Sequence, residues 1–155
     1  MRACGASGST AATAGVAAVL ALCAALMSGC APLPQAMTDA SAQGLSAVRT
    51  AELAMQLDSD DRSWPGVTTT SLADAERELS DAAATVAEAD VGTPAEQALR
   101  DETLAALRAG LDAVNAARAS LTVEPTGGSA TATAVVDALD AAADDLEALV
   151  EAGGG

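Results

Sequence analysis

The residue with the most distinctive chemistry in this chain is Cys30, because its thiol stands at the end of an uncharged apolar run. Residues 11–27 carry no charge and Arg2 precedes them, which is the layout of a secretory signal. An ordinary signal ends in an A-x-A-like cleavage site, whereas here the small residues Ser28 and Gly29 lead directly into the cysteine. This order of residues predicts processing and modification at Cys30.

Residues 26–30, Leu-Met-Ser-Gly-Cys, resemble the lipobox of bacterial lipoproteins, with Met27 where that motif most often has Leu. The resemblance covers only about the first thirty residues. It implies cleavage between Gly29 and Cys30, a diacylglyceryl thioether on the Cys30 thiol, and a mature chain that begins at Cys30. Two or more acyl chains hold a protein stably on a bilayer. The expected location is therefore the extracytoplasmic face of the bacterial cell membrane, with the lipid on Cys30 as the anchor.

Two other interpretations of this segment stay open. Residues 11–27 are at the lower limit of the roughly 17 to 25 residues that span a bilayer, so the segment could remain as an uncleaved transmembrane anchor. It could also be a plain secretory signal that is removed without lipid attachment.

The cysteine and histidine content excludes several classes of enzyme. Cys4, Cys23 and Cys30 are the only cysteines, so the mature domain would contain neither a thiol nor a disulfide. The chain has no His, which excludes E-x-x-H di-iron motifs, zinc-protease motifs and a His-assisted serine nucleophile. We expect no enzyme, no cofactor and no Cys-rich metal site.

The charge and composition bear on partners. The net charge of −15 argues against nucleic acid and anionic lipid surfaces as partners. We attribute the acidity to the solvated surface of helices, with a cationic ligand or partner as the alternative. Abundant Ala, together with the absence of Lys, Ile, Phe and Tyr, resembles the composition of actinobacterial lipoproteins.

Two groups of acidic residues invite a chemical interpretation. Residues 58–61 contain three aspartates, as a calcium loop does. However, Ser63 stands at the sixth loop position, where a calcium loop has glycine, and Thr69 stands at the twelfth, where it has a bidentate acid. We therefore predict an acidic helix-end loop and no metal site. The acid pairs Glu76 with Asp81 and Asp101 with Glu102 would need a pocket that shifts one pKa, and the sequence pattern predicts no such pocket.

Four helices must position whatever site the domain has. The first is expected over residues 37–57, with an untidy apolar stripe through Leu45, Val48 and Met55. Pro65 and Gly66 are expected to break any helix, and residues 67–70 are expected to be extended because they are β-branched.

The second helix is expected to begin at a capping box of Ser71 and Asp74, to carry a heptad seam, and to end at a left-handed cap on Gly92. For the third helix, Thr93-Pro94-Ala95-Glu96 supplies a capping hydroxyl, a proline at the first position and a carboxylate three residues after the cap. Gly110 is expected to weaken this helix by about 1 kcal/mol relative to Ala. The fourth follows residues 125–128 and carries Val135, Leu139, Ala142, Leu146 and Leu149.

These elements predict an all-α fold: a small Ala-rich antiparallel four-helix bundle after an N-terminal signal segment. The alternative is an extended helical hairpin that pairs with a partner, and oligomerisation stays open. The domain boundaries are a signal peptide at 1–29, a lipidated tether at 30–36, the bundle at 37–152 and a disordered tail at 153–155.

Trp64 is the only aromatic residue and lies in the longest predicted loop. It is expected to plug the end of the bundle, or else to stand exposed as an anchor for a partner protein, since Trp is enriched at binding hot spots. Together these features predict a membrane-anchored lipoprotein with a structural, scaffolding or accessory role through protein contacts at the cell envelope. The alternative function is binding of a small ligand in an apolar groove between the first and fourth helices.

Overall fold

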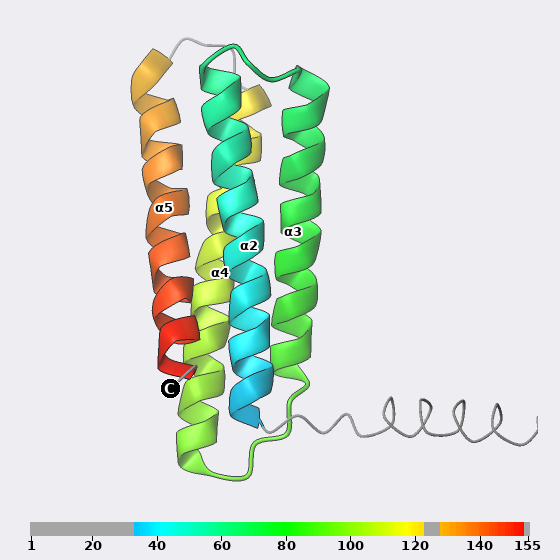
Figure 1. Cartoon of the computed structure of the whole chain (residues 1–155), viewed down its shortest axis with the longest axis vertical. Helices are drawn as coiled ribbons and strands as arrows, with labels where there is room; N and C mark the ends of the chain where they lie inside the picture. Colours follow the sequence, from blue (N-terminus) through cyan, green and yellow to red (C-terminus); the bar gives the residue numbers. More distant parts are fainter. Residues whose placement is uncertain (1–32, 123–127, 154–155) are drawn as a thin grey trace, which may run out of the picture. The chain divides into compact units, whose positions relative to one another are not determined.

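Four long helices form an antiparallel bundle in which sequential helices are neighbours (Figure 1). The computed structural model describes residues 33–122 and 128–153, and Cys30 and the whole signal segment lie outside them. The helices are α2 (Leu33–Ser59), α3 (Pro65–Ala87), α4 (Pro94–Thr122) and α5 (Gly128–Gly153). The prediction of an all-α four-helix bundle is confirmed.

The core is built from one apolar face of each helix. The largest of its fully buried side chains are Met37, Leu72, Leu79, Leu107, Leu139 and Leu146. Many of the remaining core positions are alanines, so the backbones approach closely over a core of small side chains. Helix α2 packs against α3 and α5 and also contacts α4 across the bundle, whereas the described parts of α3 and α5 are not in contact.

Two glycines lie on the diagonal contact between α2 and α4. A Cβ on Gly44 of α2 would lie 2.5 Å from Leu107 Cδ2 of α4. A Cβ on Gly110 of α4 would lie 3.1 Å from Val48 Cγ2 of α2. Gly110 has a low helix propensity, as expected, but it also has a role in packing, because the absence of a side chain makes room for the opposite helix.

Helix α2 begins at Leu33, earlier than the predicted Met37, so residues 33–36 of the expected tether are helical. Proline is tolerated in the first turn of a helix because the amide N–H groups there have no partner inside the helix. The carbonyl of Pro34 accepts a hydrogen bond from Thr38 Oγ1 at 2.9 Å.

The start of α3 corrects the sequence analysis. The helix begins at Pro65 with Trp64 as its N-cap residue, so residues 67–70 are helical and Ser71 lies inside the helix and does not cap it. Pro65 occupies the first-turn position that proline favours and starts the helix, where we expected it to break one. Thr68 is fully buried, and its hydroxyl bonds to Ser63 Oγ at 2.9 Å and donates to Asp58 Oδ1 at 3.1 Å.

Helix α2 ends in a Schellman motif centred on Asp61. The Arg62 amide donates to the Leu57 carbonyl at 2.9 Å and the Asp61 amide donates to the Asp58 carbonyl at 3.1 Å. Asp61 has a φ of 55°, the left-handed conformation that glycine usually supplies at this point. The acidic segment 58–61 therefore comprises the last two residues of α2 and the left-handed turn that follows them, so that only Asp60 and Asp61 lie beyond the helix.

Of two predictions for the turn between α3 and α4, one is wrong and one is confirmed. Helix α3 ends at Ala87 with Glu88 as its right-handed C-cap, so Gly92 is not the cap. The capping box of α4 is present: the Glu96 amide donates to Thr93 Oγ1 at 3.2 Å, and Glu96 Oε2 accepts from the Gly92 and Thr93 amides, each at 2.9 Å. The hydrogen bond from the Gly92 amide, followed by one from the Thr93 hydroxyl to Glu96 Oε2 at 3.0 Å, lowers the pKa of the Glu96 carboxyl.

At the other terminus, α5 continues to Gly153, a residue that the sequence analysis placed in a disordered tail. Gly153 packs so closely on Thr38 of α2 that a Cβ there would overlap the Thr38 hydroxyl. The beginning of α2 and the end of α5 therefore lie against each other.

Candidate functional site

Trp64 stands exposed at one end of the bundle. The residue is 81% exposed, so the plug interpretation is wrong. The backbone of Trp64 is extended, and its carbonyl accepts hydrogen bonds from the amides of Val67 at 2.8 Å and Thr68 at 3.3 Å. These bonds fix the residue at the start of α3 while its indole stays outside the core.

The corner between α2 and α3 behind Trp64 is closed by hydrogen bonds between polar side chains. Thr68, fully buried, links Asp58 at the end of α2 to Ser63 in the loop. Thr68 therefore closes this corner of the bundle, and the plug, one of the two roles expected for Trp64, is not filled by the indole.

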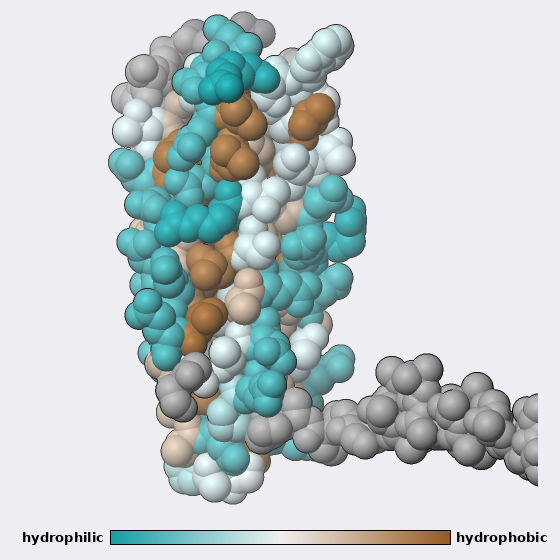
Figure 2. All heavy atoms as spheres, viewed as in Figure 1, coloured by the Kyte–Doolittle hydropathy of each residue, from teal (hydrophilic) through white to brown (hydrophobic). Residues whose placement is uncertain are grey.

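Other large apolar side chains are exposed on the same half of the molecule. Leu53 on α2 is 55% exposed and Val67 on α3 is 58% exposed. Figure 2 shows apolar residues at the surface over the upper parts of α2 and α3, close to where α2 ends and α3 begins. We define Leu53, Trp64 and Val67 as the Trp64 patch. Exposed apolar groups of this kind mark interaction surfaces when they gather at one place.

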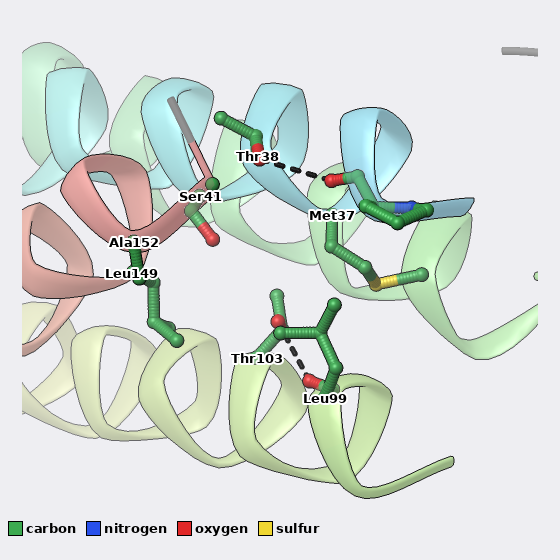
Figure 3. Close-up of a pocket in the computed structure, with 9 residues that line it drawn as sticks. Met37, Thr38, Ser41, Leu99, Thr103, Leu149 and Ala152 are labelled. Carbon is green, nitrogen blue, oxygen red and sulfur yellow. Dashed lines mark hydrogen bonds between the residues drawn. The ribbon is translucent and has the colours of Figure 1, made fainter. Parts of the chain in front are cut away.

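A hollow lies near the opposite end, where α2 begins and α5 ends (Figure 3). Its volume is about 310 Å³, at the lower end of the roughly 300 to 1,000 Å³ typical of ligand pockets. Side chains and backbone from α2, α4 and α5 line it: Pro34, Met37, Thr38, Ser41, Leu99, Thr103, Leu149, Ala152 and Gly153. None of these residues has an ionisable side chain.

Among the described residues that line the hollow, three carry hydroxyl groups, and one of these groups has no partner. Thr38 donates to the Pro34 carbonyl and Thr103 to the Leu99 carbonyl, each at 2.9 Å, as the dashed lines in Figure 3 show. Ser41 is 1% exposed and its Oγ makes no hydrogen bond in the described structure. Figure 3 shows this hydroxyl directed into the space between the three helices.

The acid pairs considered in the sequence analysis are not brought together in a pocket. Glu76 forms an ion pair with Arg118, which joins α3 to α4. Asp81, Asp101 and Glu102 are exposed on their helices. Among residues 33–122 and 128–153, no group of three or more acidic side chains is placed to hold a metal ion.

A cluster that the sequence analysis missed joins α2 to α5. Arg49 lies 2.9 Å from Glu52 of its own helix, and 2.6 Å from Asp140, 3.4 Å from Asp144 and 3.7 Å from Glu147 of α5. The hydrogen bond to Glu52, followed by that to Asp140, raises the pKa of the Arg49 guanidinium above its ordinary value. The spacing of the α5 acids by four and three residues places them on one helix face, and this signal was available in the sequence.

No protein-family model, curated protein or solved structure matches this chain. Within the described ranges, no helix has the length and hydrophobicity needed to cross a membrane. Cys30, the predicted lipidation site, lies outside those ranges.

Proposed function

We propose that this protein is a lipid-anchored, extracytoplasmic component of the bacterial cell envelope with a structural, scaffolding or accessory role, and that it binds a protein partner through the Trp64 patch. The lipobox-like residues 26–30 support the anchor on Cys30. The exposure of Trp64 is the observation that carries the proposal of protein contact, because a monomer gains nothing from placing its one large aromatic side chain in water.

The geometry of α2 supports a division between an anchored end and a contact end. The helix begins three residues after Cys30 and has 27 residues, which at about 1.5 Å per residue gives a length of roughly 40 Å. Trp64 follows the far end of this helix. The bundle would therefore act as a spacer that presents the Trp64 patch away from the point of attachment.

The anchor is tested by the intact mass of the protein isolated from the membrane fraction of its host, beside a Cys30→Ala variant. We expect a wild-type chain that starts at Cys30 and carries acyl mass, and an unprocessed variant without that mass. An unprocessed wild-type chain in the membrane would instead indicate a transmembrane segment at residues 11–27.

The contact is tested by site-specific photocrosslinking in host cells, with a photoreactive amino acid at position 64. The matched control places the same group at Glu102, which is exposed on the half of α4 nearer its beginning. We expect an envelope protein crosslinked at position 64 and not at position 102. Equal crosslinking at both positions, or none at position 64, would contradict the proposed contact.

A further inference from the structure

The unpartnered hydroxyl of Ser41 is the feature of the hollow that packing does not explain. A buried polar group without a hydrogen bond destabilises a fold, and an Ala at position 41 would avoid this destabilisation. Thr38 and Thr103, the other hydroxyl residues of the hollow, both bond to the carbonyl four residues earlier, whereas Ser41 does not. Its Oγ is instead directed into the space between α2, α4 and α5 (Figure 3).

We propose that the hollow between α2, α4 and α5 binds a small, uncharged, mainly aliphatic molecule, and that Ser41 Oγ forms a hydrogen bond with a hydroxyl or carbonyl oxygen of that molecule. The apolar walls supplied by Met37, Leu99 and Leu149 contact the aliphatic part. Ser41 supplies the one polar contact that fixes the orientation, which is the usual division of labour in ligand pockets.

The lining also sets the charge of the ligand. A carboxylate or an ammonium group would enter the hollow without a partner of opposite charge among the nine described lining residues, because none of these nine is ionisable. The net charge of −15 further disfavours an anion. An alcohol or an ester therefore fits the hollow better than a fatty carboxylate of the same length.

This site goes beyond the protein contact proposed for the Trp64 patch and does not depend on it. The hollow lies where α2 begins, whereas the patch lies where α2 ends. A ligand here would bridge α2 to α4 and α5 at the end of the bundle nearest Cys30 in the sequence.

The probe for this proposal is 1-octanol, added to the full chain in phosphatidylcholine nanodiscs with ¹³C-labelled methionine methyl groups. Met37 lines the hollow, while Met55 is buried elsewhere in the core and serves as an internal control. We expect the Met37 resonance to shift and saturate while the Met55 resonance stays in place. An unmoved Met37 resonance, or equal shifts of both methionines, would overturn the proposal.

Variants and a charged analogue test the role of Ser41. Ser41→Ala should weaken 1-octanol binding roughly two- to tenfold, as expected for the loss of one hydrogen bond, and should raise the stability of the ligand-free protein. Ser46→Ala, on an exposed position of the same helix, should change neither. Octanoate at the same free concentration should bind at least about tenfold more weakly than 1-octanol. Unchanged affinity in Ser41→Ala, or equal affinity for octanoate, would refute the assignment.

Discussion

Gly44 of α2 and Gly110 of α4 both leave room for the same methyl group, Cδ2 of Leu79. A Cβ on Gly44 would lie 3.4 Å from this atom and one on Gly110 would lie 3.2 Å from it. The two glycines thus define the point at which α2 and α4 approach each other across the bundle, with Leu79 of α3 between them. Substitution at the two positions should nevertheless have different effects.

We predict that Gly44→Ala destabilises the bundle by about 1–2 kcal/mol. The new methyl group would lie 2.5 Å from Leu107 Cδ2, and Leu107 is fully buried, so the surrounding core must shift. Gly110→Ala should be close to neutral, because its contacts at 3.1 Å and 3.2 Å need movements of only a few tenths of an ångström and Ala is about 1 kcal/mol better than Gly in a helix. Urea unfolding followed by circular dichroism measures both, and greater destabilisation by Gly110→Ala would contradict this assignment.

Trp64→Ala should change the free energy of unfolding by less than about 0.5 kcal/mol, because the residue is 81% exposed. The control is Leu72→Ala, which removes a fully buried side chain and should cost about 2–5 kcal/mol. If Trp64→Ala were destabilising by several kcal/mol, the indole would have to be part of the core. Thermal and urea unfolding of both variants give the comparison.

The capping box of α4 should make stability depend on pH in the acid range. The pKa of Glu96 is lowered in the folded state, so its contribution is fully present above the pKa of the unfolded chain, roughly 4.3. That contribution is lost as the pH falls through the lower pKa of the folded state. Glu96→Gln should remove this part of the acid dependence, while Glu102→Gln, on an exposed position, should keep it. Thr93→Ala, which removes the capping hydroxyl, should cost about 1 kcal/mol at neutral pH.

Arg49→Met should destabilise the contact between α2 and α5 by roughly 1 kcal/mol at low salt. The substitution leaves Glu52, Asp140, Asp144 and Glu147 facing one another without a cation. Added salt should narrow the difference from wild type, because it screens both the lost attraction and the new repulsion. Arg77→Met is the control, since Arg77 pairs only locally with Asp74 in the described structure, and it should have a smaller effect.

Asp61→Gly should be neutral or stabilising by up to about 1 kcal/mol, because glycine adopts the left-handed conformation at φ 55° without steric cost. Asp61→Val should be destabilising, since a β-branched residue is strongly disfavoured there. Destabilisation by Asp61→Gly would mean that the Asp61 side chain itself stabilises the turn. Equilibrium unfolding of the two variants separates these outcomes.

Local signals in the sequence predicted the parts of the fold that depend on local chemistry. The capping box of Thr93 and Glu96 and the apolar seams of α3 and α5 were predicted because neighbouring residues in the chain determine them. The start of α3 was not predicted, because a proline can either break or begin a helix. At Pro65 the outcome depends on the bonds of Thr68 to Asp58 and Ser63, residues on both sides of the loop.

The candidate sites were harder to predict because they depend on contacts between helices. The first helix looked untidy in the sequence because two of its core positions are Ser41 and Gly44 rather than large apolar residues. Their spacing with Met37 and Val48 was a usable signal that they face the core. The missing partner of Ser41 becomes visible only once α4 and α5 are placed beside α2.

The chain has a single Trp and no Tyr or Phe, so its near-ultraviolet absorption and intrinsic fluorescence come from one side chain. That side chain is already largely in water, so its emission should change little when the core unfolds. A protein that covers the end of the bundle should, by contrast, move the indole to a less polar environment and shift its emission to shorter wavelength. The emission wavelength of Trp64 should therefore report association at the Trp64 patch, and it should depend little on whether the core is folded.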